Sequence, residues 1–394
     1  MNENILAKAV QEYIDNNLNK DVNQIALAKS SFLGVSSAAI AGQILAKKKS
    51  EKKLPTWFNT KGIYYPPALS IEQTSSEITA AYKAKLGVGT TLIDLTGGFG
   101  IDTYYFSKRF KSVTHCEINI DLSEIAAYNA KILQTNNIDF MAVDGMDFMA
   151  KTDSRFDTIY IDPARRASKG KVFMLKDCTP DITTTLDLLL EKSKRIIIKT
   201  APLLDITAGL NELNQVSEIH IISTKNECKE LLWIIDSGYI GEPEIFAIAI
   251  NEEEKQFSFN KSEVSSPINF ALDTSKFKYL YEPDAALLKS GAFNLIGKRY
   301  GLEKLHPQTQ LYLSNVVNSE FPGRIFELKE QLSTAQIKKE QNLTGNIIVR
   351  NYPAKAEELV KKFKIKPSHN LFLIFTKINN NENIIFKANI IQHY

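Results

Sequence analysis

The sequence predicts an α/β protein with a doubly wound, Rossmann-like parallel sheet, preceded by a helical block and followed by an α+β domain. Between residues 70 and 250, short apolar segments rich in β-branched residues alternate with segments of helical periodicity. Such alternation is typical of a parallel sheet covered by helices on both faces. A glycine-rich turn directly after the first apolar segment is the second observation. The third is the length of 394 residues, which predicts two or three domains.

Residues 1–69 are predicted to form a helical domain and a bridge. Apolar residues recur at helical spacing over 4–50, and Ser36-Ser37 is suited to cap a helix over 38–49. That helix ends in Lys47-Lys48-Lys49. These lysines can be interpreted in two ways: their positive charge stabilises the carboxyl end of the helix, or they contact the phosphate of a ligand. The prolines that follow predict an irregular bridge.

Residues 70–250 are predicted to form one domain. Its first helix is expected to run to Leu86, because Ser70 and Gln73 resemble a capping box. In an open parallel sheet ligands bind beyond the carboxyl ends of the strands, so the residues that follow each strand are the candidate site. Strands are expected at 91–95, 112–117, 138–142, 157–162, 194–200, 217–223, 230–236 and 244–250, and helices at 101–110, 121–135, 180–192 and 205–213.

A polar, irregular segment over 252–278 predicts a domain boundary. We expect a linker and a small α+β region over 251–322 and a further α+β domain over 323–394. The second of these is expected to close on a hairpin across Asn379-Asn380-Asn381. The net charge of +3 is uneven, because residues 251–394 contain 20 Lys and Arg against 15 Asp and Glu, or +5. This excess is compatible with RNA binding and equally with a solvated surface.

The turn Gly97-Gly98-Phe99-Gly100 is the candidate cofactor-binding element. Glycines accept positive φ and leave no Cβ between backbone and ligand, and the helix that follows presents free N–H groups. The dinucleotide fingerprint G-x-G-x-x-G requires a third glycine where this chain has Thr103. Asp94 at the end of the strand would repel a pyrophosphate but attract the ammonium and sulfonium of S-adenosylmethionine. Thr103 and Asp94 therefore both count against NAD, and the residues after the later strands must decide the cofactor.

Carboxylates follow the next two predicted strands. Glu117 ends the second strand, where it can accept both hydroxyls of a ribose, a role that fits NAD equally well. Asp144 follows the third strand and can accept from an adenine amino group. Acidic residues at strand ends also cap helices and form turns, so a structural role stays open for both.

The fourth strand ends sharply at Asp162-Pro163-Ala164-Arg165. A carboxylate beside a backbone that proline holds rigid can orient an amino group for attack on a neighbouring methyl group. A reaction of this kind depends mainly on alignment. We predict that these four residues form the catalytic segment.

In this order and spacing, Asp94-x-x-Gly-Gly-x-Gly, Glu117, Asp144 and Asp162-Pro-Ala-Arg resemble the class I S-adenosylmethionine-dependent methyltransferases over residues 70–250. The resemblance implies that Gln73 and Thr74 face the methionine end of the donor. It implies a cofactor site made of Gln73, Thr74, Asp94, Thr96, Gly97, Gly98, Gly100, Glu117, Ile118, Asp144, Gly145 and Asp162.

The segment at strand four departs from two related groups. Nucleic-acid amino methyltransferases have Asp/Asn/Ser-Pro-Pro and an aromatic residue there, whereas this chain has Ala164 and Arg165. Uracil C5 methyltransferases have the more similar Asp-Pro-Pro-Arg, but they need a cysteine after strand five, where this chain has Lys199 and Thr200. We therefore reject the C5 reaction and keep Lys199 and Thr200 as candidates for holding the substrate.

The whole chain is similar to a bacterial subgroup of these enzymes with a C-terminal ferredoxin-like and THUMP-like portion. Residues 281–292 and 345–394 carry this resemblance. It implies structured RNA, tRNA or rRNA, as the partner, and the core also resembles guanine-N2 cap methyltransferases, which suggests an exocyclic amine. Basic residues over 350–366 are candidates for phosphate contacts or an exposed helix face.

Scattered cysteines and histidines argue against metals and disulfides. The three cysteines lie far apart and the five histidines show no ligand spacing. The chain has no apolar run near the ~20 residues of a membrane helix and no signal peptide, so we expect a cytoplasmic protein.

The function predicted from these residues and resemblances is an S-adenosylmethionine-dependent methyltransferase acting on an exocyclic amino nitrogen of RNA. A non-catalytic RNA-binding or assembly factor that retains the fold is the first alternative. A nicotinamide enzyme and a methyltransferase of DNA, small molecules or protein are the others.

Overall fold

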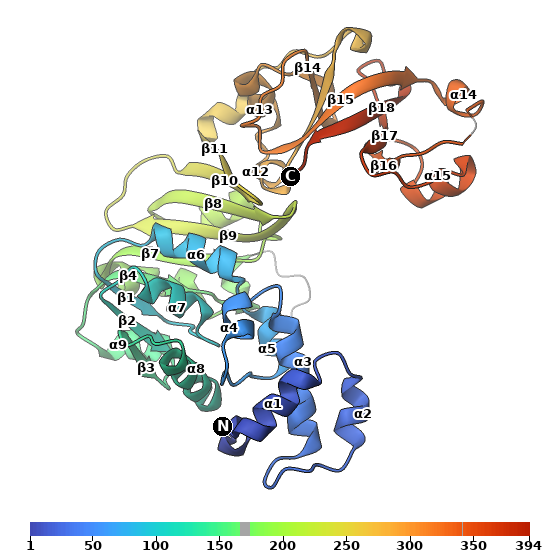
Figure 1. Cartoon of the computed structure of the whole chain (residues 1–394). Coiled ribbons are helices and arrows are strands. Elements are labelled where there is room, and N and C mark those ends of the chain that lie inside the picture. The colour runs from blue at the N-terminus through green and yellow to red at the C-terminus, as the bar shows by residue number, and fades with distance from the viewer. Residues whose placement is uncertain (166–173, 341) are drawn as a thin grey trace. The chain divides into compact units, whose positions relative to one another are not determined.

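The computed structural model describes residues 1–165, 174–340 and 342–394. The chain divides into two compact units (Figure 1). Unit 1 contains Met1–Ser217 and Leu232–Gly241, and unit 2 contains Glu218–Leu231 and Glu242–Tyr394. No helix in the described ranges is both long and apolar enough to cross a membrane.

Unit 1 begins with a block of short helices, as the sequence predicts. Ser36 caps α3 by accepting from the Ala39 N–H (3.2 Å), which confirms the predicted start of this helix. Lys47 pairs with Asp15 (2.5 Å), which ties α3 to α1 rather than leaving this lysine for phosphate. The elements are a 3₁₀ turn (Glu3–Leu6), α1 (Lys8–Asn16), α2 (Val22–Leu27), α3 (Ser37–Ser50), α4 (Pro55–Asn59) and α5 (Ala68–Gln73).

The predicted single helix from residue 69 to Leu86 is wrong, because α5 stops at Gln73 and α6 begins at Glu77. Ser70 lies inside α5 rather than capping it. The true cap is Ser76, whose hydroxyl accepts from the Thr79 N–H (3.2 Å) at the start of α6 (Glu77–Leu86). A run of Ser and Thr side chains offers the backbone several local partners, and extended backbone at Thr74 and Ser76 separates the two helices.

A sheet with its strands in the order β9-β7-β4-β1-β2-β3 forms the centre of unit 1, and the strands from β7 to β3 pair in parallel. The chain runs outward from β1 to β3 and then returns to β4 on the other side of β1, so the topological switch lies between β1 and β4. The strands are β1 (Thr91–Asp94), β2 (Ser112–Cys116), β3 (Ile138–Met141), β4 (Phe156–Ile161), β7 (Ser193–Thr200) and β9 (Glu227–Asp236, of which unit 1 contains the part from Leu232).

Helices and short strands connect the sheet, close to the predicted positions. The expected helix at 180–192 is shorter, because a 3₁₀ turn (Ile182–Thr184) precedes α10. The remaining elements are α7 (Ile101–Ser107), α8 (Ile120–Ile132), α9 (Gly145–Lys151), β5 (Ala164–Arg165), a 3₁₀ turn (Leu175–Asp177), β6 (Cys178–Thr179), α10 (Leu186–Glu191) and α11 (Ile206–Glu212).

Unit 2 contains strands β8 (Val216–Thr224, from Glu218), β10 (Glu244–Ile250) and β11 (Glu254–Asn260). β10 pairs in parallel with β8 and antiparallel with β11. The expectation of an irregular segment from 252 onward is therefore wrong at β11. Phe257 and Phe259 alternate with exposed polar residues and are buried, which gives the strand one apolar face.

A second sheet of unit 2 has seven strands in the order β13-β14-β12-β15-β18-β17-β16. The predicted closing hairpin is confirmed, because β17 and β18 pair antiparallel around Asn381, which has φ of +66°. The elements are 3₁₀ turns (Lys261–Ser265, Thr274–Lys276), β12 (Tyr279–Pro283), α12 (Ala285–Ser290), α13 (Phe293–Tyr300), β13 (Glu303–His306), β14 (Thr309–Ser314), β15 (Gly323–Leu332), α14 (Thr334–Ile337), β16 (Asn346–Val349), α15 (Ala356–Phe363), β17 (Leu371–Lys377) and β18 (Asn383–Gln392).

Candidate cofactor and acceptor site

A cleft of about 460 Å³ lies at the carboxyl ends of β1, β2 and β4, at the topological switch of the sheet. This is where ligands bind in open parallel sheets. We call it the cofactor cleft. It is lined by Ser70, Gln73, Thr74, Ser75, Leu95, Thr96, Gly97, Gly98, Phe99, Ile101, Asp102, Cys116, Glu117, Ile118, Leu122, Asp144, Gly145, Met146, Asp162, Ala164, Thr179 and Pro180.

The glycine turn after β1 forms the floor of the cleft, and its three glycines are required for two different reasons, a close contact and positive φ. A Cβ on Gly97 would lie 2.2 Å from the buried His115 ring. Gly98 has φ of +55° and Gly100 has φ of +83°, which side-chain-bearing residues rarely adopt. Gly100 starts α7 behind the turn and does not line the cleft. The sequence therefore located the turn correctly, and its glycines are needed for its geometry.

Asp94 lies beneath this turn with 1% of its surface exposed. Its carboxylate accepts hydrogen bonds from the Thr96 N–H (3.0 Å) and the Thr103 hydroxyl (2.7 Å). At the position where a dinucleotide fingerprint has its third glycine, this chain therefore has a threonine whose hydroxyl donates a hydrogen bond to Asp94. Burial raises the pKa of Asp94 to about 7, although the bond from Thr103 favours the ionised form. Asp94 does not line the cleft, and its two hydrogen bonds hold the turn in shape.

Glu117 follows β2 and connects the turn to the cleft wall. One carboxylate oxygen accepts from the Gly98 N–H (2.9 Å), and the other accepts from the Asn119 N–H (2.8 Å). Each oxygen keeps a second lone pair for a ligand hydroxyl. The neighbouring Ile118 is 70% exposed and lines the cleft, so its apolar side chain is available to the flat face of a ligand.

Asp144 and Gly145 form the third wall of the cleft. Asp144 caps α9 by accepting from the Met146 N–H (2.8 Å) and the Asp147 N–H (3.1 Å), so the structural role left open by the sequence is present. It also lines the cleft, and the two roles coexist because one oxygen makes both cap bonds. A Cβ on Gly145 would lie 2.4 Å from the Leu95 carbonyl oxygen, which explains the glycine.

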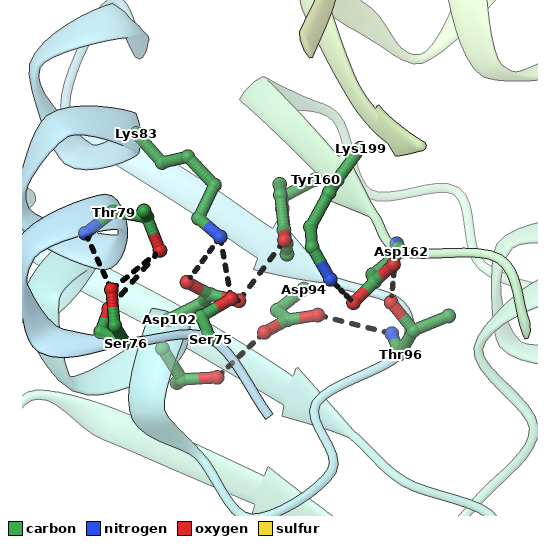
Figure 2. Close-up of polar contacts among 11 residues, drawn as sticks. Ser75, Ser76, Thr79, Lys83, Asp94, Thr96, Asp102, Tyr160, Asp162 and Lys199 are labelled. Atoms are coloured by element: carbon green, nitrogen blue, oxygen red, sulfur yellow. Dashed lines mark hydrogen bonds and ion pairs between the residues drawn. The ribbon is translucent and has the colours of Figure 1, made fainter. Parts of the chain in front are cut away.

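Asp162, the first residue after β4, is held from two sides (Figure 2). Its N–H donates to the Thr96 hydroxyl (2.7 Å), and its Oδ2 accepts from the Lys199 ammonium. Ala164 is exposed to the cleft, whereas Pro163 is buried and does not line it. The backbone of Arg165 pairs with Cys178, but its side chain and Arg166 lie outside the described residues.

Gln73 and Thr74 line the cleft, as the resemblance implies. Lys199 and Thr200, the two candidates for holding the substrate, lie at the end of β7, and the Lys199 ammonium donates a hydrogen bond to Asp162. Thr200 is 6% exposed and its hydroxyl accepts from the Trp233 indole N–H (2.9 Å). It therefore stabilises the packing of β9 against β7. Burial raises the pKa of the Cys228 thiol to about 12, so this thiol is not activated as a nucleophile. Among the described residues no cluster of metal ligands is found.

A buried network that the sequence did not predict supports the cleft. Lys83 of α6 is fully buried, and its ammonium lies 2.9 Å from Asp102 Oδ1 and donates to the Ser75 hydroxyl (2.6 Å). Asp102 Oδ2 accepts from Ser75 (2.7 Å) and from the Tyr160 hydroxyl (3.0 Å), as Figure 2 shows. Although burial alone would raise it, the pKa of Asp102 lies below its ordinary value because Lys83 and Lys199 favour the carboxylate.

Comparisons with known proteins identify the family of the chain. Family models match a ferredoxin-like domain at residues 279–322 and a THUMP domain-like region at 323–388. A Porphyromonas gingivalis W83 protein, named provisionally as a methyltransferase, has a crystal structure that is 30% identical, covers 100% of both chains and gives a TM-score of 0.88. The chain therefore belongs to the family of S-adenosylmethionine-dependent methyltransferases with ferredoxin-like and THUMP-like domains at the C-terminus.

Curated relatives match parts of the chain. An uncharacterized S-adenosylmethionine-dependent methyltransferase of Mycobacterium tuberculosis is 25% identical over 232 residues, which is 57% of this chain and 61% of the relative. An uncharacterized RNA methyltransferase of Mycoplasma mobile is 29% identical over 90 residues, 23% of this chain and 25% of the relative. The chain thus spans about 61% of the length of the first of these relatives.

Proposed function

We propose that this protein binds S-adenosylmethionine in the cofactor cleft and transfers its methyl group to an exocyclic amino nitrogen of a base in structured RNA, tRNA or rRNA. The observation that carries the proposal is the arrangement of the cleft. Three carboxylates, Glu117, Asp144 and Asp162, follow β2, β3 and β4 of the same sheet and line one cleft with a glycine turn as its floor. Membership of the methyltransferase family supports the choice of cofactor.

The cleft fits this cofactor in shape and charge. A Cβ on Gly97 would collide with the residues behind the turn, so the backbone there stays bare and close to a ligand. The cleft is lined by acidic side chains, and the turn 97–100 has no lysine that could bind a phosphate. This charge suits a ligand that carries an ammonium and a sulfonium. In this proposal Gln73 and Thr74 hold the methionine end, Glu117 accepts from the ribose hydroxyls, and Asp144 and Ile118 contact the adenine.

When bound, S-adenosylmethionine supplies an electrophilic methyl group. The chain's own contribution is alignment. Asp162, fixed by Thr96 and Lys199, accepts one hydrogen of the target amino group and thereby directs the nitrogen lone pair into the cleft. The proton that nitrogen loses on methylation passes to Asp162 or to water, which reaches the partly exposed carboxylate, whose exposed fraction is 32%.

RNA as the substrate rests on unit 2. The THUMP domain-like region covers α15, where Lys361, Lys362, Lys364 and Lys366 are exposed on or just after one helix (Figure 1). The Mycoplasma mobile relative is named as an RNA methyltransferase. Four exposed lysines near one another can contact phosphates, and each such contact makes affinity fall as salt is added.

A non-catalytic RNA-binding factor is the second candidate, and one observation favours it. Ala164 and Arg165 stand where nucleic-acid amino methyltransferases have a proline and an aromatic residue, so a stacking partner for the base is missing at this position. The factor would bind the cofactor and RNA but transfer nothing.

Methyl transfer to RNA tests the proposal. Purified protein is incubated with [methyl-³H]S-adenosylmethionine and with total RNA from cells that lack the gene, and the RNA is digested to nucleosides. We expect label in one base that carries a methylated exocyclic amine, and its loss with Asp162→Ala. Full cofactor binding with no labelled RNA would favour the second candidate, and label on a ring carbon or a ribose would contradict the amine assignment.

A further inference from the structure

The pairing of Asp162 with Lys199 is built into the register of two adjacent strands. β4 and β7 run parallel, with Ile161 opposite Ile198, so the next residues on each strand are Asp162 and Lys199. Both side chains are largely withdrawn from water, with exposed fractions of 32% and 15%. A carboxylate and an ammonium at this depth interact more strongly than an exposed pair, because water screens them less.

The two partners face the cleft unequally. Asp162 lines the cofactor cleft and Lys199 does not, so the lysine reaches the carboxylate from the side of the sheet (Figure 2). Lys199 occupies Asp162 Oδ2, and no hydrogen bond to Oδ1 is found among the described residues. Thr96 holds the backbone of Asp162 from the turn (2.7 Å). The carboxylate is therefore fixed in position and paired with an ammonium, while Oδ1 remains for a ligand.

We propose that Lys199 is a positioning and specificity-determining residue: it fixes the Asp162 carboxylate and cancels its charge, so that the acceptor site takes a neutral amino group rather than an ammonium. This inference rests on the proposed function and names the class of acceptor. An unpaired carboxylate beside the cleft would attract protonated amines such as lysine side chains, whose nitrogen has no lone pair to donate. A carboxylate already matched by an ammonium offers an acceptor oxygen without that attraction.

The same two strands provide a matched control. At their amino-terminal part, Lys194 of β7 pairs with Asp157 of β4 (2.7 Å). This lysine is 75% exposed and lies outside the cofactor cleft. Lys194→Met therefore removes an ion pair between β4 and β7 without changing the acceptor site, and Lys199→Met removes the pair within it.

The first test needs no RNA. Sinefungin has a primary amine where S-adenosylmethionine has its methyl group, and S-adenosylhomocysteine has neither. Both affinities are measured by calorimetry for the wild type, Lys199→Met, Lys199→Arg and Lys194→Met. We expect Lys199→Met to increase the preference for sinefungin over S-adenosylhomocysteine by about tenfold, because the bare carboxylate attracts the amine. Adding Asp162→Asn to Lys199→Met should abolish the gain, and an unchanged preference in Lys199→Met would overturn the inference.

The second test uses the methyl transfer assay with total RNA. We expect Lys199→Met to lower kcat by about 10²-fold through misplacement of the carboxylate, with KM for RNA within about threefold of wild type. Lys199→Arg should recover most of the loss and Lys194→Met should behave as wild type. Equal losses in the two methionine variants would refute a specific role for Lys199. If wild-type protein labels no RNA, the proposed function fails, and the sinefungin preference alone still decides this inference.

Discussion

The buried carboxyl of Asp94 predicts an unusual dependence of stability on pH, which Asp94→Asn should remove. Asp94 is 1% exposed, and burial raises its pKa from the ordinary value of 3.8 to about 7. The folded protein then keeps a proton between pH 4 and pH 7 that the unfolded chain releases. Because the unfolded state binds fewer protons in this range, the free energy of unfolding falls as pH rises.

The magnitude follows from the two pKa values. Between 3.8 and about 7 lie roughly three pH units, and each is worth ~1.4 kcal/mol, so this group removes about 4 kcal/mol of stability between pH 4 and pH 8. Asparagine does not titrate, and its amide oxygen still accepts from the Thr96 N–H. Asp94→Asn should therefore gain stability relative to the wild type as pH rises.

Urea unfolding of both proteins at intervals from pH 4 to pH 8 measures this difference, and titrations shared by the two proteins cancel in it. We expect the difference in free energy of unfolding to change by about 4 kcal/mol across the range, with most of the change below pH 7. A difference that stays constant from pH 4 to pH 8 would refute the assigned state of Asp94. The ammonium group that S-adenosylhomocysteine shares with S-adenosylmethionine favours the ionised acid, so S-adenosylhomocysteine should bind the wild type more tightly at pH 8 than at pH 6, and this trend should weaken in Asp94→Asn.

Three further predictions follow from the packing and the charges. Lys83→Met leaves a buried carboxylate without its cation and should lower the free energy of unfolding by about 3–5 kcal/mol in urea, whereas Lys85→Met on the exposed face should change it by less than about 0.5 kcal/mol. Gly97→Ala places a Cβ against a buried ring and should cost about 1–3 kcal/mol with loss of S-adenosylhomocysteine binding by calorimetry. Replacing Lys361 and Lys362 together by alanine should reduce the slope of the logarithm of the RNA association constant against log [salt] by about 1.4–1.8. An unchanged slope would show that these lysines of α15 do not contact the RNA.

Sequence periodicity predicted the sheet and its site well, because both depend on local patterns. Apolar β-branched runs locate β1, β2, β4 and β7, and a cluster of glycines identifies a turn that needs positive φ at Gly98 and Gly100 and a close approach at Gly97. Residues at strand ends converge because parallel strands end at one edge of a sheet. This is why Glu117, Asp144 and Asp162, far apart in the chain, line one cleft.

Features that depend on partners distant in sequence were not predictable in this way. Lys83 lies on a helix and contacts Asp102 only after α6 packs on α7, so its spacing gives no sign of an ion pair. Ser76 rather than Ser70 caps a helix, because adjacent Ser and Thr residues offer several equivalent caps and only packing selects one. The strand β11 follows charged residues that suggest a linker, yet two buried phenylalanines make it part of a sheet.

Thermal stabilisation by S-adenosylhomocysteine, with NAD as the control, tests the central claim most directly. A ligand present at about 100 times its dissociation constant should add ~2.7 kcal/mol to the free energy of unfolding. We predict a clear rise in Tm with S-adenosylhomocysteine and none with NAD. A rise with NAD alone, or no rise with either ligand, would contradict the assignment of the cofactor cleft.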